Sequence, residues 1–142
     1  MFHSQSAHTL HEDQPFPICL EYNLHGGDGV NDRPNGQVCL PGTKVMIGGK
    51  PNPGFCNDPE VGHTFHGDQW VTLEIEVRDD VISHYVDGEK ILTYTDPRYD
   101  TDNEVAAVLM QNGDGRLRSG HIAIQSNSHP IDFRSIEILE LD

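Results

Sequence analysis

The chain has 142 residues and a formal net charge of −14 at pH 7, and hydrophobic residues make up 35% of it. Such a surface would repel nucleic-acid phosphates, so we expect no nucleic-acid partner. Mean hydropathy is −0.52 and no apolar run approaches the roughly 20 residues of a membrane span, so we also expect no membrane partner. An acidic surface suits a neutral ligand such as a sugar, and it equally suits a salt-adapted protein.

The length favours one domain, which we predict to span residues 1–142. Residues 1–6 contain neither a basic stretch nor an apolar stretch, so we expect that they are not a signal peptide.

Nine prolines and fourteen glycines divide the chain into short pieces, which is typical of an all-β domain. The first predicted strand covers residues 17–24. Its even-numbered residues are apolar, and its odd-numbered residues include Cys19, Glu21 and Asn23. Alternation therefore predicts a core face with Ile18, Leu20, Tyr22 and Leu24, and puts Glu21 and Asn23 together on the other face.

Three cysteines leave at least one unpaired. Cys39 and Cys56 flank a stretch rich in Gly, Pro and Asn, and a disulfide between them would order this loop. It would contribute roughly 3 kcal/mol in an oxidising compartment, with Cα atoms no more than about 7 Å apart. The alternative is three reduced thiols.

The clearest period of two begins at Trp70, where Val71, Leu73, Ile75 and Val77 alternate with polar residues. Residues 78–80 turn the chain, and Asp87-Gly88 predicts a tight hairpin. Residues 70–94 should therefore form three consecutive antiparallel strands.

Three further segments follow. Residues 104–111 fit one or two helical turns, but their length and the following Asn112-Gly113 favour a short strand. In residues 120–125 we expect Ile122 and Ile124 to face the core. Residues 133–141 are predicted to form a last apolar strand, with a shift of parity that a bulge or burial on both faces would explain.

Several of these residues resemble one known family. The C-terminal motifs are Gly120-x-Ile122-x-Ile124-Gln125 and Ser128-His129-Pro130-x-x-Phe133-Arg134. Upstream stand Trp70, the hairpin His84-Tyr85-Val86-Asp87-Gly88, and Glu21-Tyr22-Asn23, which is similar to an E-x-Q strand. Together they resemble the 3-keto-disaccharide hydrolase domain, formerly a domain of unknown function.

The resemblance implies an antiparallel β-sandwich of the concanavalin A-like jelly-roll type and a link to bacterial carbohydrate breakdown. Members act on 3-keto sugars, in which the ketone acidifies the neighbouring C–H and permits elimination and hydration at the glycosidic bond. They usually begin with a W-x-x-x-x-G-x-[IL] strand and an aromatic-rich strand, and this chain matches neither. We therefore expect a jelly roll that is incomplete at its N-terminus. The resemblance also implies a periplasmic or secreted location.

The resemblance also implies a saccharide site on the concave face of a sheet. We predict three catalytic residues: Glu21 as acid or base, His129 as a proton carrier, and Arg134 as a cation for a substrate oxygen. Asn23 and Gln125 are predicted to bind sugar hydroxyls. The structural alternatives are a solvated strand face for Glu21 and Asn23, an ion pair for Arg134, and a turn for His129.

No cofactor is predicted. His63, His66, His8 and His11 lie in loop sequence without a third ligand at a readable spacing, so we predict no transition-metal site. Asp28, Asn31 and Asp32 leave an irregular Ca²⁺ site open, without positive support. The paired carboxylates of a retaining glycosidase have no matching motif.

These observations leave several functions open. The first is an enzyme acting on a modified disaccharide or glycoside, and the second is a non-catalytic carbohydrate-binding or vestigial module. A third is an interaction protein dominated by its oligomer interface. A sandwich without its first strands exposes an edge and a strip of core, so we predict a homodimer with residues 136–141 at the interface. The alternative is a monomer in which residues 1–16 fold back over the gap.

Overall fold

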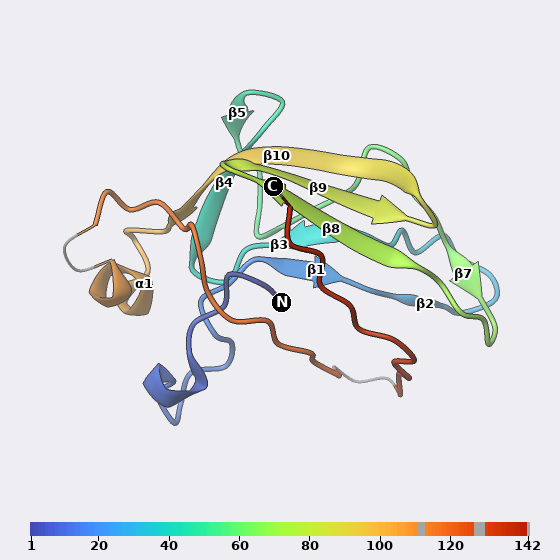
Figure 1. Ribbon diagram of the computed structural model, residues 1–142. Helices are drawn as coiled ribbons and strands as arrows, with labels where there is room; N and C mark the ends of the chain where they lie inside the picture. Colours follow the sequence, from blue (N-terminus) through green and yellow to red (C-terminus); the bar gives the residue numbers. More distant parts are fainter. Residues whose placement is uncertain (111–112, 127–129, 142) are drawn as a thin grey trace.

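Two antiparallel β-sheets pack face to face in the computed structural model (Figure 1). The structure describes residues 1–110, 113–126 and 130–141. This architecture confirms the predicted all-β antiparallel sandwich. Within the described residues, no helix is long and apolar enough to cross a membrane.

The larger sheet has the strand order β5-β4-β10-β9-β8. Its strands are β4 (Thr43–Ile47), β5 (Lys50–Pro51), β8 (Leu73–Arg78), β9 (Val81–Val86) and β10 (Glu89–Tyr99). The last three are the predicted meander. Asp87 and Gly88 have φ of 47° and 82°, the left-handed conformation that a primed hairpin turn requires.

The smaller sheet contains β1 (Glu21–Asn23), β3 (Gln37–Cys39) and β6 (Cys56–Asn57), in the order β1-β3-β6. Two short strands, β2 (Gly26–Gly27) and β7 (Phe65–His66), pair in parallel beside it. A 3₁₀ turn, η1 (Ala7–Thr9), and one α-helix, α1 (Glu104–Leu109), are the helical elements of the described residues.

Both ends of the chain extend the smaller sheet. Phe2 and Leu20 exchange two backbone hydrogen bonds, of 2.9 and 3.1 Å, and Ser4 and His121 exchange two of 2.9 Å. Residues 1–5 therefore lie beside residues 18–20, and residues 121–123 lie beyond them. This placement covers part of the exposed edge, as proposed for residues 1–16 in a monomer.

Gly120 makes the contact between the two ends possible. A Cβ at this position would lie 2.4 Å from the backbone carbonyl carbon of His3, closer than real Cβ atoms approach. His3 itself has φ of 46°, and this irregular residue separates the bonds of Phe2 to Leu20 from those of Ser4 to His121. The first residue of the C-terminal motif is therefore a glycine because a side chain would prevent this close contact.

The core lies between the sheets and contains the face predicted for residues 17–24. Ile18, Leu20 and Tyr22 are buried, and Leu24 packs partly buried against the core. His84 is fully buried in the same layer and stacks on Tyr22, with ring centroids 4.3 Å apart. The ring stack joins β9 of the larger sheet to β1 of the smaller one.

The strand predicted at residues 104–111 is wrong, because Glu104–Leu109 form α1. The side chain of Asn103 accepts a hydrogen bond of 3.0 Å from the backbone N–H of Ala106 and caps the helix. Ala106 is buried and anchors the helix to the body. The capped helix forms local backbone bonds, from the N–H groups of Ala107 and Met110 to the carbonyls of Asn103 and Ala106, which an isolated short strand cannot do.

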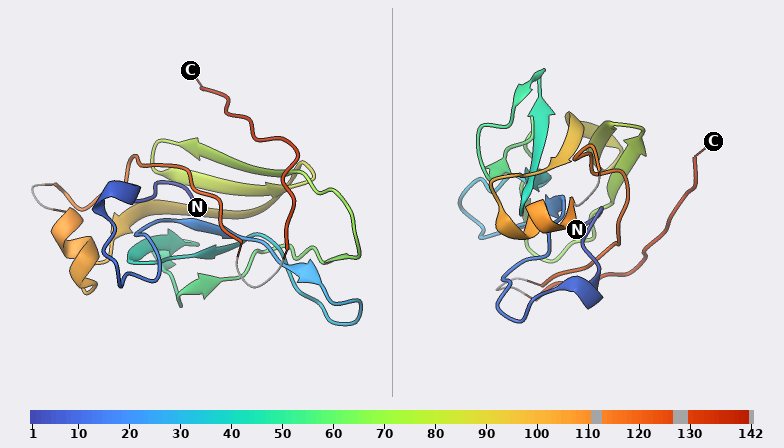
Figure 2. Two further views of the ribbon diagram at one scale, coloured as in Figure 1. Left: turned by 90° about the horizontal axis from the view of Figure 1, so that it is seen from below. Right: turned by 90° about the vertical axis from the view of Figure 1, so that its left-hand side faces the viewer.

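The predicted strands near the C-terminus also differ from the structure. Ile122 and Ile124 do not face the core, since they are 60% and 52% exposed. Their segment is the outermost one of its layer, with backbone bonds to residues 1–4. Residues 130–141 form neither helix nor strand. An apolar alternation becomes a strand only beside a partner, and this segment stands clear of both sheets (Figure 2).

Candidate functional site

The outer face of the smaller sheet carries the first two predicted site residues. Tyr22 points into the core, so its neighbours Glu21 and Asn23 share the opposite face of β1. Glu21 pairs with Cys39 of β3, and Asn23 pairs with Gln37. The alternation predicted for this strand therefore places a carboxyl and an amide together on an outer sheet face.

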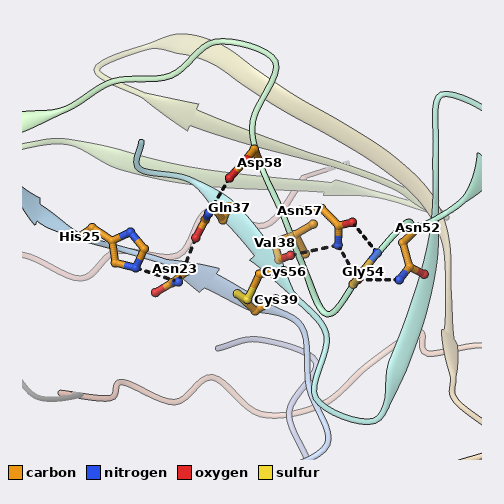
Figure 3. The surroundings of a disulfide bond; sticks show 10 residues. All are labelled: Asn23, His25, Gln37, Val38, Cys39, Asn52, Gly54, Cys56, Asn57 and Asp58. Atoms are coloured by element: carbon orange, nitrogen blue, oxygen red, sulfur yellow. Dashed lines mark hydrogen bonds between the residues drawn. A yellow bond between two sulfur atoms is a disulfide. The ribbon is translucent and has the colours of Figure 1, made fainter. Parts of the chain in front are cut away.

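A row of polar side chains crosses this face (Figure 3). The Asn23 amide donates to Oε1 of Gln37 at 3.2 Å and contacts Nε2 of His25 at 3.1 Å. Gln37 in turn donates to Oδ1 of Asp58 at 2.5 Å. This polar row, His25-Asn23-Gln37-Asp58, presents amide and carboxylate groups of the kind that bind hydroxyls.

A disulfide beside the row attaches β6 to β3. It joins Cys39 to Cys56, the pair named from the sequence, with Cα atoms 4.0 Å apart (Figure 3). Asn57 completes the attachment by donating to the carbonyls of Val38 and Gly54, at 3.4 and 3.0 Å. β6 has only two residues, so it can form few main-chain bonds to β3. The disulfide and the Asn57 bonds hold it to the sheet in addition. Cys19 is a buried free thiol.

Glu21 is half-buried, and burial raises the pKa of its carboxyl. The nearby N-terminal ammonium lowers this pKa in part. That ammonium donates to the carbonyl of Ala123 at 3.0 Å, and its own pKa is lowered, mainly by burial. A carboxylate with a raised pKa binds a proton more tightly than an exposed one, which is the property of a general base.

The other predicted site residues lie elsewhere or outside the described residues. Arg134 places its guanidinium 4.8 Å from the ring centroid of Trp70, in the loop before β8. Trp70 itself is 56% exposed and lies outside the core. Gln125 is exposed. It lies two residues after Ala123, whose N–H donates to the carbonyl oxygen of Met1. His129 lies outside the described residues.

The structure thus brings Glu21 and Asn23 together on β1, whereas the contact of Arg134 is with the loop before β8. The contact of Arg134 with Trp70 is a cation–π interaction, in which the guanidinium is attracted by the ring quadrupole. The catalytic roles of Arg134 and His129, and the hydroxyl binding by Gln125, stay predictions.

A comparison with protein-family models identifies the family. The model described as 3-keto-alpha-glucoside-1,2-lyase-like domain matches residues 1–139. The chain belongs to this family. The match confirms the resemblance of the sequence motifs, and it links this member to carbohydrate chemistry. Searches of curated proteins and of solved structures gave no match.

Two surface hollows of this family member lie away from Glu21. One, of about 300 Å³, lies between residues 4–10 and 121–123. The other, of about 450 Å³, is lined by Asp32, Thr64 and His66 among others. Neither of the two contains Glu21 or the polar row. A ligand of the outer face would therefore bind along an open sheet surface and not in a deep pocket.

Two of the side chains considered for metals, His66 and Asp28, have other contacts. In the part of the chain that the structure describes, no three His, Cys, Asp or Glu side chains gather as a metal site. Nδ1 of His66 accepts from the N–H of Gly29 at 3.0 Å. Asp28 accepts from the N–H groups of Val30 and Asn31, and these bonds hold the pKa of its carboxyl well below the usual range.

Sequence reasoning missed three members of the polar row: His25, Gln37 and Asp58. Their relation to Asn23 depends on the register in which β1 meets β3, and residues 24–36 separate the two strands. Gln37 did carry a signal, since it stands one residue before the buried Val38 and so shares the outward face of β3. No pattern in the sequence linked that face to Asn23.

Proposed function

We propose that this protein acts on a 3-keto-glycoside at the outer face of the smaller sheet, with Glu21 as the general base. One observation carries the proposal: a half-buried carboxyl with a raised pKa stands beside a row of amides, on a face open to solvent. Family membership supports the choice of this substrate class.

The chemistry needs a base at one carbon. A ketone at C3 acidifies the C2–H bond, and the Glu21 carboxylate takes that proton. The electron pair of the C2–H bond forms a C1=C2 double bond, and the C1–O glycosidic bond breaks toward the leaving alcohol. The alcohol oxygen then takes up a proton, so that the step is an elimination without net oxidation. Water addition to the double bond would complete a net hydrolysis.

The polar row would orient the sugar during this step. Asn23 and Gln37 each carry a donor and an acceptor. Asn23 lies two residues from Glu21 on β1, and Gln37 lies two residues from Cys39, the residue that pairs with Glu21. A saccharide held by these amides would present one ring face to the Glu21 carboxylate. Gln125 and His129 would add a hydroxyl contact and a proton carrier from the C-terminal segment.

A second function is non-catalytic saccharide binding, and the position of Arg134 favours it. An enolate at the ketone oxygen needs a cation or a donor nearby. The guanidinium of Arg134 is engaged by Trp70, so the developing charge would lack this partner. The polar row and Glu21 would then bind sugar without turnover.

One experiment separates these functions. Turnover of a 3-keto-α-glucoside with a chromogenic aglycone is measured, together with calorimetric binding of that compound and its unoxidised parent. We expect Glu21→Gln to lower kcat by roughly 10²–10⁴-fold while binding persists. Asn23→Ala should weaken binding by about tenfold, the effect of one hydrogen bond.

The matched control is Glu74→Gln, the same chemical change at an exposed carboxylate on β8 of the other sheet. It should leave turnover and binding unchanged. Binding without turnover in the unmodified protein would establish the binding module. Absence of both, or equal losses in Glu21→Gln and Glu74→Gln, would contradict the proposed site.

A further inference from the structure

The outer edge of β8 is open. β8 ends the strand order of the larger sheet, and among the described residues β9 is the one strand that pairs with it. Arg78 pairs with Val81 across a two-residue turn, so Arg78, Glu76 and Glu74 direct their backbone groups toward β9. The N–H and C=O groups of Leu73, Ile75 and Val77 therefore point to the open edge.

A strip of core lies uncovered below this edge. Leu73, Ile75 and Val77 pack against the core cluster and remain only half-buried. Val71, just before the strand, has the same status. An open edge with free backbone groups and apolar side chains beneath it is a template for one more strand.

The C-terminal segment has the complementary features. Residues 130–141 form no helix or strand, and Ile138 and Leu139 are 75% and 81% exposed. Ile136 and Ile138 alternate with Ser135 and Glu137, the period of a strand with one apolar face. The other exposed large apolar residues of the segment are Ile131, Phe133 and Leu141.

Arg134 brings the segment close to the loop before β8, but the segment does not pair with the β8 edge. Arg134 lies over Trp70, three residues before β8 begins. From there the two views of Figure 2 show the chain leading away from the body, with its end standing clear of both sheets. The edge and the apolar segment thus both remain uncovered within one chain.

We propose that two copies of this chain form a dimer, in which residues 135–141 of each copy add as a strand to the open edge of β8 of the other. The dimer then covers both the β8 edge and the apolar C-terminal segment. A two-fold axis makes the exchange reciprocal, so that one arrangement covers both edges and both segments. Ile136 and Ile138 then lie over the strip of Leu73, Ile75 and Val77, while Glu137 points to solvent. Main-chain bonds supply the pairing and the apolar face sets its orientation.

Charge repulsion opposes this association, so the affinity of the dimer should depend on salt concentration. Each chain carries a formal charge of −14, and Glu137 of the segment would approach Glu74 and Glu76 on the outer face of the partner's β8. Salt screens such repulsion without weakening apolar burial. The dimer should therefore become tighter as NaCl rises from 50 to 500 mM, whereas a dimer held by ion pairs would loosen.

Light scattering on the full chain tests the proposal. At micromolar concentration we expect twice the monomer mass of 15.8 kDa, about 32 kDa. Ile138→Asp should restore the monomer mass, because a carboxylate would enter the apolar strip. Val30→Asp is the matched control, since Val30 is 85% exposed in the loop between β2 and β3, outside both β8 and the C-terminal segment, and it should stay dimeric.

Hydrogen exchange locates the contact. The amides of Leu73, Ile75 and Val77 should be protected in the unmodified protein and should exchange faster in Ile138→Asp. A monomer mass for the unmodified protein at high salt would overturn the proposal, and protected β8 amides in that monomer would show the segment pairing within its own chain. A dimer that survives Ile138→Asp would also overturn it, because the interface would then lie elsewhere.

Discussion

The buried imidazole of His84 should make the stability of this protein depend on pH. Nδ1 of His84 lies 3.0 Å from the carbonyl oxygen of Gly36, and Nε2 lies 2.8 Å from the hydroxyl of Tyr94. A carbonyl only accepts, so Nδ1 carries the proton and Nε2 accepts from Tyr94. Both bonds are therefore those of a neutral ring, and protonation would leave the Tyr94 hydroxyl without its acceptor.

The size of the effect follows from the pKa. Burial, chiefly, lowers the pKa of His84 from 6.5 to about 4. Since the folded protein takes up the proton less readily than the unfolded chain, this contribution is fully present above pH 6.5 and is lost as the pH falls from 6.5 to 4. Each pKa unit corresponds to 1.36 kcal/mol, so the loss is about 3 kcal/mol.

His84→Gln removes the titration and keeps an amide able to bond with Gly36 or Tyr94. We expect the variant to be less stable at pH 7 by roughly 2–3 kcal/mol, because ring packing on Tyr22 is lost. Urea unfolding of the oxidised proteins at pH 7, 5.5 and 4 measures the gap. The carboxyl groups titrate in both proteins, so their contributions to the stability cancel in the difference.

The gap between the two proteins should shrink toward zero as the pH reaches 4. An NMR titration of the His84 ring gives an independent reading: its shifts should stay constant until the pH approaches about 4. A gap that stays constant from pH 7 to pH 4, or a ring that titrates near 6.5, would refute the reasoning from burial.

Two further predictions concern stability. Gly120→Ala should destabilise the protein by roughly 1–3 kcal/mol in urea unfolding, because its Cβ would overlap the backbone of His3. The control Gly26→Ala, which meets nothing within 4 Å, should change stability by less, and equal losses would argue against the tight contact. Cys56→Ser should cost about 3 kcal/mol by removing the bond to Cys39; a reducing agent should lower the unmodified protein to the same level and leave the variant unchanged.

The meander could be predicted because its signals are local. Alternation from Val71 to Val77 specifies one face, and Asp87-Gly88 specifies the turn, so neighbouring residues determine the register. The same alternation fixed the faces of Glu21 and Tyr22.

The rest depends on contacts between distant parts of the chain. Residues 121–123 occupy an outer position because Met1 and Ser4 bond to them, which no local pattern of the C-terminal motif indicates. Arg134 meets Trp70 across 64 positions of sequence, and the polar row depends on how β1, β3 and β6 align. The helix α1 was missed for a different reason: one capping side chain, Asn103, outweighed a weak strand preference.

The proposed site and the proposed interface lie on different sheets, which makes one last test informative. Glu21 and the polar row occupy the outer face of β1, β3 and β6, whereas the dimer would form at the β8 edge of the other sheet. Ile138→Asp should therefore yield a monomer that still binds a 3-keto-glucoside with unchanged affinity in calorimetry. If the monomer lost binding while Val30→Asp retained it, the partner's segment would have to contribute to the saccharide site, and the C-terminal motif would act in the second copy.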